Sequence, residues 1–198
     1  MTTTQPTSSA PELAPLPILP QRRIQVINVV SRKGGAGKTT MALLSARYLA
    51  CREQAPLVTL FDLDFCGTSL DDALDPQRER DEEAEGATGF EHFLTDGAGV
   101  PGWEVSAADA LRWYELPGTG VRMLYAASAD KEGASEEILL SGRRARDLAR
   151  ARLRRLVRWV VEQHGERRDF VFLLDNSPGV RGLSRDLLES MFEIEGSS

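Results

Sequence analysis

Ser-Arg-Lys-Gly-Gly-Ala-Gly-Lys-Thr-Thr occupies residues 31 to 40, directly after the apolar run from Ile24 to Val30. An apolar run of this length predicts a strand, and the residues that follow the glycines predict a helix. A glycine-rich turn between the two can point its backbone N–H groups at one spot, where the positive end of the helix dipole also lies. The stretch therefore predicts a strand, a turn and a helix arranged around a bound anion.

The stretch differs at one position from the phosphate-binding pattern Gly-x-x-x-x-Gly-Lys-Thr, because Arg32 stands where a glycine is usual. Small residues let the backbone approach a phosphate closely, and the expected cradle consists of Gly34, Gly35, Ala36 and Gly37. Lys38 is expected at the β- and γ-phosphates, Thr39 at a Mg²⁺ ion and Thr40 at the α-phosphate. The pattern thus predicts a bound nucleoside triphosphate with Mg²⁺.

Lysine usage supports the same interpretation. The chain holds three lysines against 21 arginines, and two of the three, Lys33 and Lys38, lie within six residues of each other. A chain that otherwise prefers arginine is expected to use the compact ammonium group at these two positions for a specific purpose.

With its second lysine, the stretch from Lys33 to Thr40 resembles the deviant Walker A loop of the ParA/MinD family of partitioning and positioning ATPases. Leu57 to Asp64, Leu-Val-Thr-Leu-Phe-Asp-Leu-Asp, resembles the second strand of that family with its Asp-x-Asp switch. Phe170 to Gly179, Phe-Val-Phe-Leu-Leu-Asp-Asn-Ser-Pro-Gly, resembles its Walker B strand and second switch. The three motifs follow the family's order, and the resemblance covers about residues 24 to 192.

Three aspartates then receive expected roles. Asp175, at the end of an apolar strand, suits a Mg²⁺ ligand that acts through water. The resemblance implies that Asp64 orients the attacking water, and Asp62 is expected to support the metal shell. In the alternative interpretation, Asp62 and Asp64 are only the polar residues with which a loop begins.

The resemblance also implies that Lys33 reaches across a dimer to the ATP of the other subunit. Lys33, Lys38 and Asp64 are accordingly the expected catalytic residues. A cation placed against phosphates would make ATP hold two subunits together, and hydrolysis would then loosen the homodimer. A protein partner that activates or reads this switch is expected as well.

The elements alternate along the chain. Strands are expected at 24–30, 57–61, 121–127 and 170–174, and the main helices at 38–54, 141–164 and 184–192. Residues 89–94 predict a short helix, and 103–111 an irregular element. We expect the first helix to pack on the sheet through a stripe made of Met41, Leu44, Ser45 and Tyr48. This order predicts an α/β fold with an open, mainly parallel sheet and helices on both faces.

Composition bounds the remaining possibilities. Residues 1–20 hold five of the ten prolines and predict a disordered Pro/Thr/Ser-rich tail, which leaves 21–198 as one P-loop ATPase domain. The net charge of −6 argues against a globally basic nucleic-acid binder. We find no signal peptide, no membrane span and no cysteine framework, so a cytoplasmic protein is expected.

Eight arginines lie between Arg143 and Arg158. They could bind DNA phosphates nonspecifically, with strong salt dependence. The alternative, which we favour here, is a solvated helix face.

The sequence ends soon after the second switch, so the C-terminal part of the usual domain is expected to be missing. The family's C-terminal membrane helix is not expected, and base specificity stays open. The main functional hypothesis is a Mg²⁺-dependent ATPase that dimerises with ATP to position or segregate DNA or a protein complex. The alternative is a nucleotide-gated interaction protein with little turnover that a partner completes.

Overall fold

The computed structural model describes residues 22–64, 70, 74, 90–95, 110–126, 143–167, 169–176, 179 and 183–195. The predicted tail at 1–20, most of the first switch and residues 103–109 of the element expected at 103–111 lie outside this part of the chain. The described strands are β1 (Arg23–Val29), β2 (Leu57–Leu63), β3 (Leu111–Leu116), β4 (Val121–Ala126) and β5 (Asp169–Asn176). The helices are α1 (Lys38–Ala50), α3 (Phe90–Thr95), α6 (Arg143–Gln163) and α7 (Leu183–Glu195).

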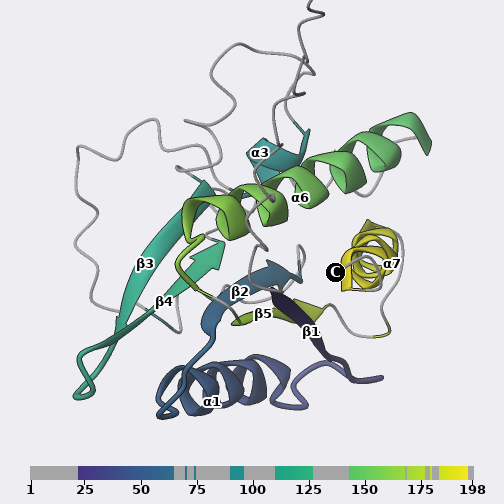
Figure 1. Ribbon diagram of the computed structural model, residues 1–198. Coiled ribbons are helices and arrows are strands. Elements are labelled where there is room, and N and C mark those ends of the chain that lie inside the picture. The colour runs from purple at the N-terminus through teal and green to yellow at the C-terminus, as the bar shows by residue number, and fades with distance from the viewer. Residues whose placement is uncertain are drawn as a thin grey trace, which may run out of the picture.

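The strands form one sheet in the order β1-β5-β2-β4-β3 (Figure 1). β5 pairs in parallel with β1 on one side and with β2 on the other, and β2 pairs in parallel with β4. The prediction of an open, mainly parallel α/β sheet is confirmed. Because the strands run parallel, β1, β2 and β5 all end at one edge of the sheet, where the three sequence motifs meet.

β3 is a strand that the sequence pattern did not predict, since an irregular element was expected at 103–111 and no strand between it and the strand expected at 121–127. Leu111–Leu116 pairs antiparallel with β4 through a turn in which Gly118 and Gly120 both have positive φ. The strand is short and lies at the edge of the sheet, and between its two buried ends half-buried residues alternate with exposed ones, so its apolar signal is weak. The pairing with β4, not the composition of the segment, makes it a strand.

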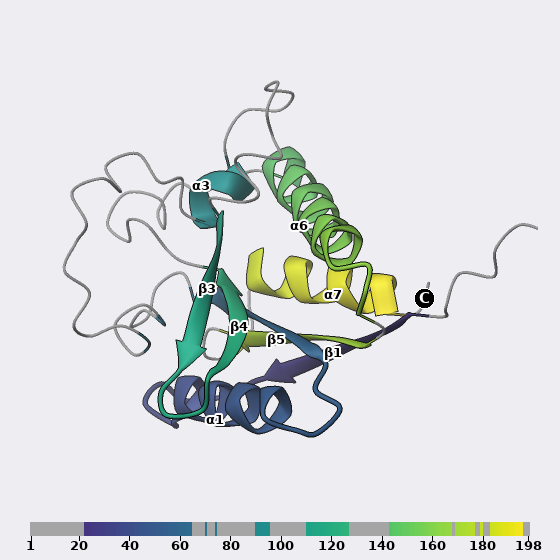
Figure 2. The same cartoon turned by 60° about the vertical axis from the view of Figure 1, so that its left-hand side comes forward.

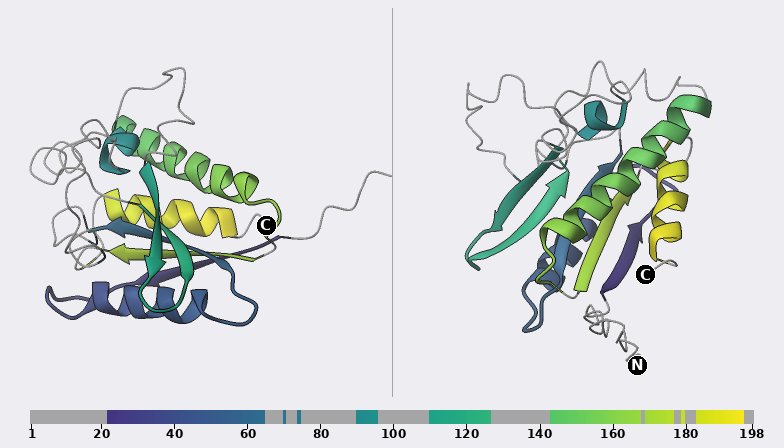
Figure 3. Two further views of the ribbon diagram at one scale, coloured as in Figure 1. Left: turned by 90° about the vertical axis from the view of Figure 1, so that its left-hand side faces the viewer. Right: turned by 45° about the horizontal axis from the view of Figure 1, so that its top comes forward.

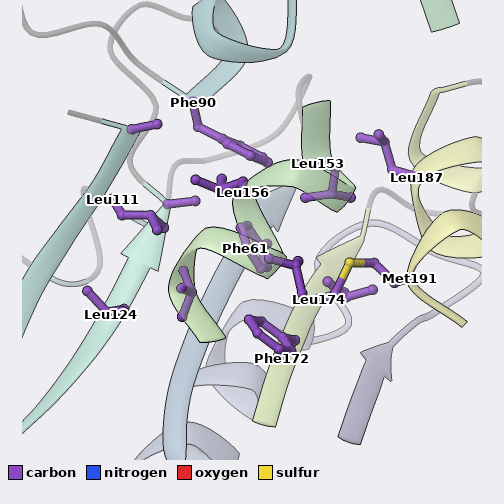
Figure 4. Packing of buried hydrophobic residues seen from close by; sticks show 14 of the residues in the cluster. Phe61, Phe90, Leu111, Leu124, Leu153, Leu156, Phe172, Leu174, Leu187 and Met191 are labelled. Carbon is purple, nitrogen blue, oxygen red and sulfur yellow. The ribbon is translucent and has the colours of Figure 1, made fainter. Parts of the chain in front are cut away.

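Helices cover both faces of the sheet. α1 lies on one face, while α3, α6 and α7 lie on the other (Figures 2 and 3). Between the sheet and the second group lies the larger core cluster, in which Phe61 of β2 contacts Phe90 of α3 and Phe172 of β5 at ring-centroid distances of 5.4 and 6.0 Å. Figure 4 shows these rings against leucines of α6 and α7. The packing holds β2 and β5 firmly side by side.

α6 and α7 are also joined by ion pairs. Arg150 and Arg154 both reach Glu193, at 3.1 and 2.9 Å, and Arg146 lies 3.4 Å from Asp186. Arg152 donates a hydrogen bond to the carbonyl of Phe93. At least half of the eight arginines between Arg143 and Arg158 therefore make contacts within the fold.

α1 overturns the expected core stripe. Ala42, Ala46 and Ala50 face the sheet and are buried, whereas Met41, Leu44 and Tyr48 are 56, 56 and 70% exposed. Alanines bring the helix axis close to the sheet because they leave no long side chain between them. The prediction that the larger apolar residues pack inward is wrong, and the helix ends at Ala50 instead of residue 54.

None of the helices in the described part of the chain is both long and apolar enough to cross a membrane.

Candidate nucleotide-binding site

The loop between β1 and α1 has the backbone shape that its glycines predict. Gly35 and Gly37 have φ values of 68° and 75°, a region that residues with a Cβ rarely adopt. Gly37 is the N-cap of α1, and no side chain caps the helix. The N–H groups of the first turn therefore have no capping side chain in front of them, as an anion site at a helix N-terminus requires.

Lys38 begins α1 and is 8% exposed. Its Nζ lies 3.8 Å from the Oδ2 of Asp64, which directly follows β2. The separation exceeds that of a hydrogen bond, so the pair is held by charge alone. A buried ammonium needs an anion, and in this arrangement Asp64 supplies it.

Asp175, near the end of β5, is buried at 1% exposure and lies at the same edge of the sheet. Burial raises the pKa of its carboxyl above the usual 3.8, the Thr39 hydroxyl that hydrogen-bonds to it and Lys38 oppose this rise, and Asp64 adds to it. Its Oδ1 is buried and has no hydrogen-bond partner. An unpartnered buried carboxylate oxygen beside a threonine hydroxyl fits a Mg²⁺ ion or its water shell.

Asp62 lies beside Asp175 across the parallel pair of β2 and β5. One of its oxygens accepts a hydrogen bond from the N–H of Asp64 at 2.9 Å, and the other accepts one from the N–H of Leu70 at 3.1 Å. Asp62 thus shapes the backbone after β2 and holds Asp64 in place. Its expected contribution to the metal shell stays a prediction.

The part of the chain that the structure describes contains no group of three or more His, Cys, Asp or Glu side chains that could hold a metal ion by themselves. Proteins bind Mg²⁺ through one or two carboxylates together with water and substrate phosphates. Thr39 and Asp175 are the residues that would hold the ion here.

One hydrogen bond connects the loop with the second switch, and another lies within the loop. The N–H of Gly179 donates to the carbonyl of Ser31 at 2.9 Å, and the hydroxyl of Ser31 donates to the carbonyl of Lys33 at 2.7 Å. Ser31 and Gly179 both stand in the sequence motifs, but the pattern predicted a role for neither. Only the fold brings them together, because they follow neighbouring strands.

The remaining loop residues are at the surface. The side chain of Lys33 is exposed, as are Thr40 and the cradle residues Gly34, Gly35, Ala36 and Gly37. An exposed Lys33 can meet a second molecule. Ser177 and Pro178 of the second switch lie outside the described residues.

Two further polar residues, one at the end of β5 and one in the first turn of α7, received no role from the sequence. The buried amide of Asn176 donates to the side-chain oxygen of Asn28 on β1, and the Ser184 hydroxyl donates to the carbonyl of Leu63 at 2.8 Å. These bonds tie the end of β5 to β1, and the end of β2 to α7. Single asparagines and serines give no periodic signal, so sequence reasoning had no means of finding them.

Residues 23–92 match a family model described as ParA: NUBPL iron-transfer P-loop NTPase. The match contains β1, the loop, α1 and β2, and it confirms the resemblance over that part of the chain. None of the curated proteins matches the sequence.

Two similar solved structures carry partition or ParA names. A plasmid partition protein from Borrelia burgdorferi has a TM-score of 0.55 and 14% identity, with 84% of this chain and 60% of that chain covered. A ParA family ATPase from Chlorobium tepidum TLS has a TM-score of 0.50 and 13% identity, with 83% and 56% covered. Identities this low show a shared fold alone, and this chain spans little more than half the length of either structure.

Proposed function

We propose that this chain binds Mg²⁺ and ATP at the end of β1, hydrolyses the ATP, and acts as a ParA/MinD-type molecular switch. The observation that carries the proposal is the convergence of Lys38, Asp64 and Asp175, from α1, the end of β2 and β5, at one edge of the sheet. The match of residues 23–92 to a P-loop NTPase family supports it.

In the proposed reaction Lys38 exchanges partners. Without nucleotide its ammonium faces Asp64 at 3.8 Å, and with ATP it faces phosphate oxygens instead. Asp64 then loses its cation and can accept a hydrogen bond from the attacking water. Bound Mg²⁺ would neutralise developing charge on the phosphates, while the loop amides and Lys38 position them.

A substitution of Asp64 by asparagine tests this exchange. The neutral amide cannot neutralise Lys38, so Asp64→Asn is expected to bind ATP at least as tightly as the wild type. It should hydrolyse ATP roughly 100-fold more slowly, a typical loss for a group that handles the water. Isothermal titration calorimetry measures the first effect and phosphate release measures the second.

Asp147→Asn, which changes an exposed carboxylate on α6, is the matched control and should behave like the wild type. Unchanged hydrolysis in Asp64→Asn would remove Asp64 from the mechanism. Failure of the wild type to bind ATP would remove the proposed function itself.

The switch in this proposal is an ATP-dependent homodimer in which Lys33 contacts the nucleotide of the second subunit. The exposure of Lys33 supports this part. We expect Mg²⁺-ATP, but not ADP, to bring two nucleotide sites together in one dimer, and Lys33→Ala to fail to form that dimer. Disulfide crosslinking of an Arg32→Cys variant measures whether the loops of two subunits come together. An ATP-dependent crosslink that Lys33→Ala leaves intact would exclude this role for the lysine.

A partner that reads the dimer, and the DNA or protein complex that it positions, are part of the same proposal.

Binding of DNA by α6 has less support from the structure than the rest of the proposed function. Arg146, Arg150 and Arg154 already pair with acidic residues of α7, and Arg152 donates a hydrogen bond to the carbonyl of Phe93. Fewer arginines then remain for phosphates, and the expected salt dependence of any DNA binding falls accordingly.

The alternative is a nucleotide-gated interaction protein with little turnover. It would bind ATP with Lys38 in the same way, but Asp64→Asn would leave its behaviour unchanged.

Iron transfer, named in the description of the matching family, has little support in this sequence. Iron–sulfur clusters are held mainly by several cysteine thiolates, and the sequence offers only Cys51 and Cys66.

A further inference from the structure

Ser184 makes a hydrogen bond that joins α7 to the end of β2. Its hydroxyl donates to the carbonyl of Leu63 at 2.8 Å, and the two residues are 121 positions apart in the sequence. Ser184 is the second residue of α7 and is 4% exposed, so water competes little for this bond. The residue that accepts the bond directly precedes Asp64, the carboxylate that faces Lys38.

The peptide group between Leu63 and Asp64 is held on both sides. Its carbonyl accepts the bond from Ser184, and its N–H donates to the Oδ1 of Asp62 at 2.9 Å. A trans peptide group is planar, and its C=O and N–H point in opposite directions. Two bonds on opposite sides therefore fix the rotation of this plane. That rotation sets φ of Asp64, and with it the direction in which the Asp64 side chain leaves the backbone.

Strand pairing does not extend to this peptide group. Within the described residues, the register of β2 with β5 ends at Leu63, and the register of β2 with β4 ends at Phe61. Asp64 lies beyond both. Side chains must then satisfy and orient the backbone groups that neighbouring strands no longer hold. Asp62 does this from β2 itself, and Ser184 does it from a different element.

The packing of α7 gives Ser184 a fixed position. Leu187 and Met191 of the same helix are fully buried in the larger core cluster, as Figure 4 shows. Glu193 pairs with two arginines of α6, at 3.1 and 2.9 Å. Because the helix is held along its length, the place of its second residue is determined, and the bond passes that place on to the peptide group before Asp64.

Ser184 acts from the face of the sheet opposite the candidate nucleotide site. α7 lies on one face, and α1, which begins with Lys38, lies on the other (Figures 2 and 3). The side chain of Leu63 belongs to the core cluster on the α7 face, whereas Asp64, the next residue, faces Lys38. Ser184 therefore reaches the site through the backbone at the end of β2, and not by touching the nucleotide.

We infer that Ser184 is a positioning residue for Asp64, which it holds through the peptide group that joins Asp64 to Leu63. Since α7 follows the second switch in the sequence, the bond also connects the second switch with the aspartate of the first. The expected effect on hydrolysis rests on the proposed function, in which Asp64 accepts a hydrogen bond from the attacking water. Without the hydroxyl of Ser184 the peptide group can turn, and the carboxylate is less often in the place that the reaction needs.

Ser184→Ala tests the inference, and Ser190→Ala is its matched control. Ser190 is a fully buried serine of the same helix, and its hydroxyl donates to the carbonyl of Arg150 on α6 at 3.4 Å. Each variant loses one buried hydroxyl and deprives one carbonyl of that donor, so their melting temperatures should fall by similar amounts. A purely structural role of Ser184 predicts no other difference between the two variants.

The first measurement is hydrogen exchange of the Asp64 amide in the nucleotide-free chain, by NMR. Ser184→Ala should speed this exchange about tenfold relative to a core amide such as that of Leu173, because the peptide group is then held on one side only. Ser190→Ala should leave the ratio unchanged, and Ser184→Thr, which keeps a hydroxyl, should restore it. An unchanged ratio in Ser184→Ala would overturn the inference, whether or not the chain hydrolyses ATP.

The second measurement is phosphate release with Mg²⁺-ATP. Ser184→Ala should lower kcat about tenfold without raising KM, because the group that it loosens handles the water and not the bound nucleotide. The loss should be smaller than in Asp64→Asn, since Asp62 still holds the N–H. In the Asp64→Asn background, Ser184→Ala should have no further effect on kcat, because Ser184 acts through Asp64.

Two outcomes of the rate measurement would contradict this role. One is a kcat of Ser184→Ala that equals that of Ser190→Ala, and the other is a loss that persists unchanged in the Asp64→Asn background. A wild type that does not hydrolyse ATP would instead remove the proposed function. The exchange of the Asp64 amide would then decide by itself whether Ser184 positions this residue.

Discussion

Asp175 shows at the scale of one residue how a site can oppose stability. Burial raises the pKa of its carboxyl above 3.8, so the folded chain binds this proton more tightly than the unfolded chain does. The contribution of Asp175 to the free energy of unfolding is therefore present at low pH and is lost as the pH rises through the raised pKa of the folded state. At a pH above that pKa, the carboxylate of Asp175 is charged and buried, and its Oδ1 has no hydrogen-bond partner. Asp175→Asn should stabilise the nucleotide-free protein at neutral pH by roughly 1–3 kcal/mol. Thermal unfolding should show this gain shrinking at acidic pH, and hydrolysis of Mg²⁺-ATP should be lost. A variant less stable than the wild type at neutral pH would show that the carboxylate is satisfied.

At the scale of the element, the turn before α1 depends most on Gly35 and Gly37, the two glycines of the loop that have positive φ. Gly37 has φ of 75° while Gly34 has no positive φ, and the space around both is open. Gly37→Ala should cost about 1–2 kcal/mol of unfolding free energy, because an L-residue is strained there, and should weaken ATP binding as the turn distorts. Gly34→Ala is the matched control and should fold like the wild type. Chemical denaturation of both variants measures the difference, and equal stability would show that the turn relaxes without strain.

At the scale of the whole molecule, the candidate site joins β1, β2 and β5 through side chains that no single element holds. If Mg²⁺-ATP binds to the folded chain alone, a hundredfold excess over its dissociation constant adds about 2.7 kcal/mol to the free energy of unfolding. The melting temperature should then rise by about 2–4 °C per kcal/mol for a chain of this size. Removal of Mg²⁺ with a chelator should cancel most of this rise, and Lys38→Ala should show none. A rise that survives both changes would place the nucleotide elsewhere.

Local chemistry was enough to predict the strand from Ile24, the glycine turn, the start of α1 at Lys38 and the mainly parallel sheet. Those features follow from single residues and short runs, because glycine permits positive φ and apolar runs must be buried. The period of the stripe from Met41 to Tyr48 was visible in the same way. Its direction was not, because a period shows that a helix has an apolar side but not which side lies against the sheet, and Ala42, Ala46 and Ala50 take that place. The pairing of β3 with β4 and the approach of Lys38 to Asp64 also needed the folded chain. Contacts between residues distant in sequence depend on which strands become neighbours, and packing across the whole sheet settles that.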